Sequence, residues 1–88
     1  MKIKKERPDE KTLKEMAVET WPIWQCEPST FDWHYPEDET CYILEGEVVV
    51  KTSEGEVHIE PGDLVTFPKG LDCTWVVKKA VRKHYKLG

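Results

Sequence analysis

The chain has 88 residues, of which 39% are hydrophobic and 34% are charged, and its 13 basic and 17 acidic side chains give a formal net charge of −4. This length predicts one domain with one core, and this composition is that of a folded chain. The acidic balance argues against nucleic-acid binding, no apolar run approaches the roughly 20 residues that span a bilayer, and the charged start lacks the apolar stretch of a secretory signal.

Residues 1–20 are the most charged stretch and the only one that predicts a helix, over about Asp9–Met16. Pro8 suits the first turn, and Leu13 and Met16 share a face because they are three residues apart. A helix this short is not stable alone, so we expect it to lie on a larger body.

From residue 21 the pattern changes to short aromatic and β-branched runs that are separated by turn residues. The run 21–24 is typical of an edge strand, because Pro22 cannot donate a hydrogen bond to a neighbouring strand. Strict alternation then places Phe31, Trp33 and Tyr35 on one face. Further strands are expected over 40–44, 48–52, 56–60, 64–67, 73–78 and 81–87, with turns at 45–47, 53–55, 61–63 and 68–70. Short strands at this spacing predict an all-β sandwich, barrel or jelly roll.

The three cysteines, Cys26, Cys41 and Cys73, are widely spaced and form no Cys-x-x-Cys pair. A disulfide framework in a secreted chain more often has an even and dense set, and a structural zinc site needs closely spaced ligands. We therefore expect reduced, mostly buried thiols in a cytoplasmic protein.

Two spacings resemble the two halves of the cupin signature. The first is Glu39 followed by six residues and Gly46, and the second reads Gly62-x5-Pro68-x-Gly70-x2-Cys73. The second half is the more specific element, because a lone Glu-x6-Gly would mean little.

The resemblance covers residues 21–87 and implies an all-β cupin jelly-roll barrel (double-stranded β-helix) with a short N-terminal helix. It gives one domain over 1–88, in which 1–20 are an N-terminal strand/helix extension and 21–87 are the barrel. At finer grain the chain is similar to small single-domain cupins related to ethanolamine-utilisation protein Q and to the ureidoglycolate and ureidoglycine enzymes. It is also similar to a short thermophilic-bacterial cupin of unknown function. The stretches that carry this similarity are 39–46, 67–75 and 81–85.

Metal-binding cupins take two His and a Glu from the first motif and a further His from the second. Carried over by resemblance, the Glu position falls on Glu39, the two His positions on Trp33 and Tyr35, and the second-motif His position on Cys73. One carboxylate and one thiol do not make a metal site, so we assign no metal ligand and expect no cofactor, with a weakly held divalent metal left open.

A shift of one residue would instead bring Asp32 and His34 into the two His positions. The two registrations exclude each other, because a one-residue slip reverses every side chain of a strand.

The resulting candidate ligand-binding residues are Trp33, Tyr35, Glu39, Cys73 and Trp75, of which Glu39 and Cys73 are also the candidate catalytic residues. The aromatic rings could stack on a planar or cationic ligand, or they could simply fill a small barrel and leave no pocket.

An inward Glu39 would have a raised pKa and would suit acid–base chemistry or the binding of a cationic or amide ligand. The alternatives are a solvated loop carboxylate or a carboxylate paired with a buried partner such as Arg82. Cys73 is either a nucleophile or soft ligand with a lowered pKa, or a thiol that fills the interior.

We therefore expect a small-molecule-binding cupin without a tightly bound metal. The alternative is a metal-assisted or acid–base enzyme that acts on a small ureide or amide metabolite. The expected partners are a small molecule and a second copy of the chain, with no nucleic acid and no membrane. The homodimer is expected because Trp21 and Trp24 lie on an edge strand, unless Leu13 and Met16 of the helix cover them.

Overall fold

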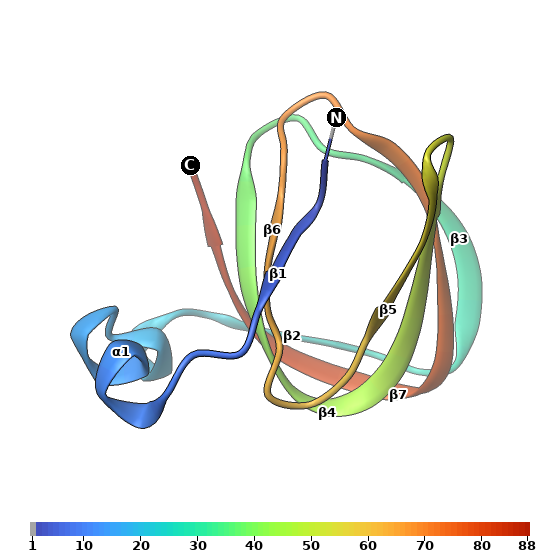
Figure 1. The fold of residues 1–88 in the computed structure, drawn as a ribbon. Helices are drawn as coiled ribbons and strands as arrows, with labels where there is room; N and C mark the ends of the chain where they lie inside the picture. Colours follow the sequence, from blue (N-terminus) through green and yellow to red (C-terminus); the bar gives the residue numbers. More distant parts are fainter. Residues whose placement is uncertain (1) are drawn as a thin grey trace.

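The computed structural model describes residues 2–88, and antiparallel β-structure dominates it (Figure 1). Met1, the first residue of the expected extension, lies outside the described residues. The strands are β1 (Lys4–Glu6), β2 (Ile23–Cys26), β3 (Ser29–His34), β4 (Glu39–Thr52), β5 (Gly55–Ile59), β6 (Leu64–Phe67) and β7 (Asp72–Leu87). A helix α1 (Glu10–Glu15) and a 3-10 turn η1 (Val18–Thr20) separate β1 from β2.

The strands form one sheet in the order β1-β6-β4-β7-β2, with β3 paired to β7 and β5 paired to β4. Every pair is antiparallel, and within residues 2–88 the hydrogen-bonded path ends at β1 and β2. Figure 1 shows that the sheet curves strongly around an interior. The predictions of an all-β fold and of the hairpin at 53–55 are confirmed, since β4 and β5 pair directly across that turn.

β4 and β7 are each one long strand, which corrects the expected division of both. The predicted turn at 45–47 is instead an irregular part of β4, where the register against β7 shifts three times between Ile43 and Val48. Gly46 has a φ of +107°, and a Cβ there would lie 2.6 Å from Ala80 O and from Val81 Cα. Glycine therefore lets β4 bend closely over β7 without ending.

Helix α1 lies within the predicted span and beside the curved sheet (Figure 1). Asp9 is its N-cap and accepts a 2.9 Å hydrogen bond from Thr12 N, which satisfies one free donor of the first turn. Half-buried Leu13 lines a cleft with Tyr42 and Leu44 of β4, so the helix lies on the sheet as expected. Neither described helical segment is long and apolar enough to cross a membrane.

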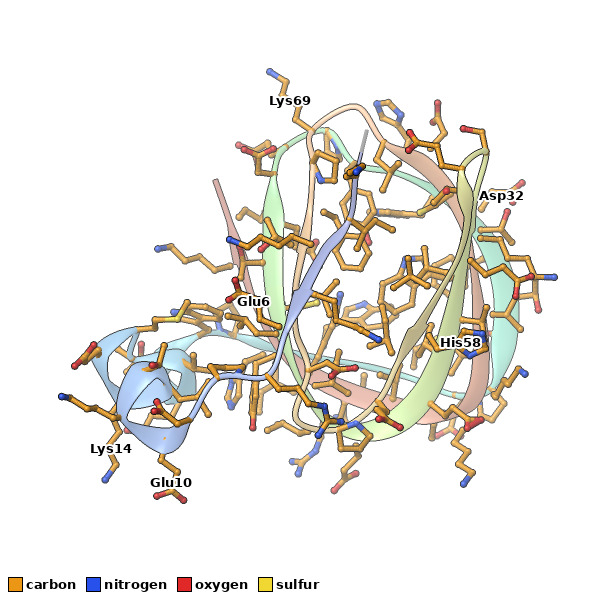
Figure 2. All side chains as sticks on the ribbon, in the orientation of Figure 1. Glu6, Glu10, Lys14, Asp32, His58 and Lys69 are labelled. Atoms are coloured by element: carbon orange, nitrogen blue, oxygen red, sulfur yellow. The ribbon has the colours of Figure 1, made fainter. Side chains whose placement is uncertain are left out.

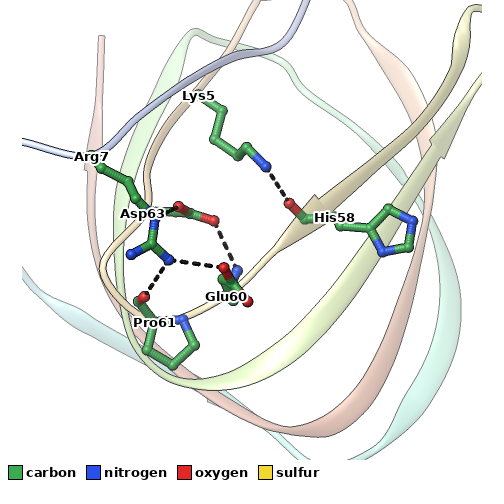
Figure 3. Close-up of polar contacts among 6 residues, drawn as sticks. All are labelled: Lys5, Arg7, His58, Glu60, Pro61 and Asp63. Atoms are coloured by element: carbon green, nitrogen blue, oxygen red, sulfur yellow. Dashed lines mark hydrogen bonds and ion pairs between the residues drawn. The ribbon is translucent and has the colours of Figure 1, made fainter.

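β1 is the strand of the expected strand/helix extension, although its three residues are charged and exposed. Arg7 follows β1 and holds this strand in place. The Nε atom of Arg7 lies 3.1 Å from Oδ1 of Asp63, and Asp63 is only 1% exposed (Figure 3). The second oxygen of Asp63 accepts the Glu60 N–H at 2.9 Å, and Arg7 Nη2 contacts Glu60 Oε1 and Pro61 O. Both oxygens of this buried carboxylate are thus satisfied, as burial requires.

The core lies inside the curve of the sheet, and Figure 2 shows side chains projecting into that space. Its aromatic members are Tyr35, Phe67 and Trp75, which are each at most 2% exposed. The fully buried aliphatic residues of β4, β5 and β6 surround them: Ile43, Val48, Val50, Ile59 and Val65. Alternate residues of the strands supply this core, since successive side chains point to opposite faces.

Candidate functional site

A cavity of about 280 Å³ remains beside the core, so the aromatic rings do not fill the interior completely. This volume is just below the roughly 300–1,000 Å³ that is usual for small-molecule sites. The cavity lies between β2, β3, β4 and β7. Six aromatic side chains line it, namely Trp24, Phe31, Trp33, Tyr35, Trp75 and Tyr85, together with Pro36, Glu37, Glu39, Lys83 and Leu87.

A buried ion pair is the most polar feature of this cavity. Lys83 Nζ lies 2.7 Å from Glu39 Oε2, and the two side chains are only 6% and 12% exposed. The ammonium group also lies over two indole rings, 4.7 Å from the centroid of Trp75 and 5.0 Å from that of Trp24. The carboxylate and both rings therefore stabilise the positive charge away from water.

The strand pairing explains why these two residues meet. Glu39 is the first residue of β4, while Lys83 lies on the same side of β7 as buried Val81 and half-buried Tyr85. Lys83 pairs in register with Trp24 of β2, and Glu39 pairs with Leu87 of β7. The antiparallel register thus places the lysine and the carboxylate at one end of the interior.

Tyr35 and Trp75 form a second polar contact within the aromatic wall. Trp75 Nε1 donates a 3.1 Å hydrogen bond to the Tyr35 hydroxyl, and the Tyr35 ring stacks on Phe67 at 4.7 Å. Burial, with a smaller contribution from Glu39, raises the pKa of Tyr35 above its ordinary value. The hydroxyl therefore stays protonated at neutral pH and can donate its own proton to a ligand.

Four of the five predicted site residues line this cavity, namely Trp33, Tyr35, Glu39 and Trp75. Trp33 is 49% exposed and therefore lies at the rim. This arrangement agrees with the registration that turns Trp33 and Tyr35 toward the interior. Asp32 and His34 point to the opposite, exposed face of β3. There the Asp32 carboxylate accepts a 2.7 Å hydrogen bond from Thr74 Oγ1, and His34 pairs with Asp72 at 2.7 Å.

Cys73 is the predicted site residue that this cavity does not include. It is buried two residues before Trp75 on β7, and it lines a separate shallow cleft with Asp72 and Thr74. Burial, supported by the Asp72 charge, raises the pKa of Cys73 to about 11 instead of lowering it. The thiol is thus protonated at neutral pH and is a poor nucleophile, which favours its alternative role as a filling side chain.

Lys83 is the main residue that the sequence analysis missed. Arg82, the suggested partner of Glu39, lies on the opposite side of β7 and pairs with Glu45 at 3.2 Å. A signal for Lys83 was present, because alternation within the predicted strand 81–87 places it on one face with Val81 and Tyr85. Trp24, Phe31, Tyr85 and Leu87 were also not assigned to the site.

The model of the EutQ-like cupin domain family matches residues 13–85. The chain belongs to this cupin family. Comparison with curated proteins gives no significant match.

Solved structures agree with the family assignment. A DUF861-family protein from Thermotoga maritima is 58% identical, with a TM-score of 0.96, over 99% of this cupin and 100% of that protein. The EutQ protein of Clostridium difficile is 26% identical, with a TM-score of 0.69, over 74% of this cupin. A putative ethanolamine utilization protein Q from Salmonella typhimurium is 28% identical, with a TM-score of 0.68, over the same share. This cupin spans about half the length of those two proteins, at 52% and 53%.

The residues at the metal-ligand positions of the family do not fit a metal in this cupin. Two of the positions hold Trp33 and Tyr35, the carboxylate of Glu39 is paired with an ammonium, and Cys73 is packed in the buried core. Among the described residues no group of three or more His, Cys, Asp and Glu side chains is arranged to hold a metal ion. The donor set therefore lacks the number and type of ligands that transition metals require.

Proposed function

We propose that this cupin binds a small molecule in the aromatic cavity beside Lys83 and Glu39, without a tightly bound metal. The observation that carries the proposal is the cavity of about 280 Å³ itself, with six aromatic walls around one buried ion pair. A concave, mostly apolar site with a few convergent polar groups is the usual form of a ligand site. We infer that the fold around this cavity is the jelly-roll barrel of the cupin family. The antiparallel pairing and the curvature of the sheet support this inference.

The four tryptophans allow a direct test, because three line the cavity and one does not. Trp24, Trp33 and Trp75 are lining residues, whereas the Trp21 ring lies beneath Lys86. In a fragment screen followed by indole N–H resonances in NMR, a cavity ligand should shift the first three signals and leave Trp21 unchanged. A screen in which no fragment shifts the three lining indoles would contradict the proposal.

A pair of matched variants adds a control at the level of affinity. Leu87→Trp enlarges a half-exposed side chain that lines the cavity, whereas Ile23→Trp does the same at an exposed position outside the lining. Leu87→Trp should weaken the binding of a screened fragment by about tenfold, the effect of losing about 1.4 kcal/mol, while Ile23→Trp should leave it unchanged. Equal affinities in both variants would place the fragment elsewhere.

Acid–base catalysis on a small ureide or amide is the second candidate function. It is favoured by the cavity position of Glu39, whose Oε2 binds Lys83 while Oε1 accepts no hydrogen bond from any described residue. A free carboxylate oxygen inside a cavity can take a proton from a bound substrate. Incubation with benzamide, followed by an assay for released ammonia, tests this candidate. Release by the wild type that Glu39→Gln abolishes would support it.

We also propose that the chain forms a homodimer through the edge strand β2. Ile23 on this strand is 47% exposed, and Trp24 beside it is half-buried. An edge strand with exposed apolar side chains is a surface that another chain can cover. Light scattering at tens of micromolar should give twice the chain mass, and Ile23→Lys should shift it to the monomer. A monomer mass for the wild type would contradict this proposal.

A further inference from the structure

The charges that line the cavity are already balanced. Lys83 and Glu39 contribute one positive and one negative charge in direct contact, and both are almost fully buried. Glu37, the other ionisable acid in the lining, is exposed, so water and salt screen its charge. A ligand that enters the cavity therefore meets a local dipole with no net charge at its buried end.

A charged ligand would disturb this balance. A cationic group that reached Glu39 would lie close to the Lys83 ammonium, and an anionic group that reached Lys83 would lie close to the Glu39 carboxylate. Either ligand would therefore meet a buried like charge or separate the ion pair, and both are costly. The ligand itself would also lose its hydration without gaining a full counter-charge.

Uncharged polar groups find partners that are free. Glu39 Oε1 can accept a hydrogen bond, and the Tyr35 hydroxyl can donate one because it uses only its lone pair to accept from Trp75. An amide group offers an N–H donor beside a carbonyl acceptor, which matches this acceptor and this donor. The flat rings of Trp24, Phe31 and Trp75 favour a planar molecule, which can stack or pack edge-on against them.

We infer that the cavity selects a neutral planar molecule with an amide-type group over cationic and anionic molecules of the same shape. This inference rests on the proposed binding function, and it names the chemical class of the ligand. Lys83 is then a selectivity residue, because it neutralises the carboxylate that would otherwise attract cations.

Three probes of nearly equal shape separate charge from size. Benzamide is neutral, whereas at pH 7 benzamidine carries a positive charge and benzoate a negative one. NMR titrations of the wild type, read at the indole signals of Trp24, Trp33 and Trp75, should give benzamide a Kd at least about tenfold below those of both ions. If none of the three shifts these signals while fragments from the screen do, the inference on ligand class is overturned and the binding function stands. If no compound of any kind shifts them, the binding function fails.

Two variants should change the preference in opposite directions. Lys83→Met leaves the Glu39 charge without a partner, so benzamidinium should become the tightest ligand. Glu39→Gln leaves the Lys83 charge without a partner and should favour benzoate. Should either single variant fail to fold, the double variant Glu39→Gln/Lys83→Met carries no buried charge and should keep the preference for benzamide. Glu45→Gln, which alters an exposed ion pair outside the lining, should leave all three affinities unchanged.

The inference is overturned if benzamidinium or benzoate binds the wild type most tightly. It is also overturned if the folded single variants keep the wild-type order of affinities, because the ion pair would then not control the choice of ligand.

Discussion

The ammonium of Lys83 lies 2.7 Å from the carboxylate of Glu39, although the two residues are 44 positions apart in the chain. Their side chains join β4 to β7 inside an aromatic cavity, and both are almost completely removed from water. This contact links the stability of the fold to the chemistry of the candidate site.

Removal of one member of this pair should destabilise the fold. Glu39→Gln and Lys83→Met should each lower the free energy of unfolding by about 3–5 kcal/mol, because each leaves an unpaired buried charge. Urea unfolding at pH 7 measures the effect. Glu45→Gln is the matched control, since the Glu45 side chain is 64% exposed in its ion pair with Arg82, and its loss should cost at most about 1 kcal/mol.

The double variant Glu39→Gln/Lys83→Met removes both charges together. It should be less destabilised than the sum of the two single variants, because no buried charge is left without a partner. A Glu39→Gln variant within about 0.5 kcal/mol of the wild type would show that the pair contributes nothing to folding.

Asp63 should be more important for stability than Glu60, although Arg7 contacts both. Asp63 is buried and accepts hydrogen bonds from Arg7 Nε and Glu60 N, whereas the Glu60 side chain is 67% exposed. Asp63→Ala should cost about 1.5–3 kcal/mol, because it removes the charged acceptor of both hydrogen bonds and releases β1. Glu60→Gln should cost less than about 1 kcal/mol. Urea unfolding gives both values, and equal losses would contradict the assignment.

Stability should fall at alkaline pH because of the buried thiols. Burial raises the pKa of Cys41 and of Cys73 to about 11 from a reference value of 9.0. The folded chain therefore holds these protons more tightly than the unfolded chain. The resulting stabilisation is complete below about pH 9 and is lost as the pH rises through 11.

Unfolding free energies measured from pH 7 to 11 test this expectation. Cys41→Ala should lower stability at every pH through its cavity, but it should flatten the decline between pH 9 and 11 by on the order of 2 kcal/mol. Cys26→Ala, at a half-buried position, is the control and should leave the decline unchanged. The same slope in wild type and Cys41→Ala would rule out a contribution from this thiol.

Metal content should be far below one transition metal ion per chain in protein purified without chelator. The reason is the set of side chains at the ligand positions. Aromatic side chains stand at two of them, and the carboxylate of Glu39 is already paired with the ammonium of Lys83. Elemental analysis gives the stoichiometry. Stoichiometric manganese, iron, nickel or zinc that Glu39→Gln removes would overturn this prediction and favour the metal-assisted enzyme.

Local patterns in the sequence determined the all-β architecture, the helix before it and the inward face of β3. Side chains alternate with a period of two along a strand, so the order of polar and apolar residues alone placed Trp33 and Tyr35 on the cavity side. The spacing of the two glycine motifs indicated the cupin family, which the match over residues 13–85 confirms.

Only the tertiary structure decided which residues meet. The choice of Lys83 over Arg82 as the partner of Glu39 depends on the register of β4 against β7, which contains three shifts near Gly46. Alternation within 81–87 could place Lys83 on the apolar face of its strand, but a local pattern does not fix which residue of β4 that face meets. The same long-range packing buries Cys73 in the core and raises its pKa, because desolvation depends on neighbours that are distant in the sequence.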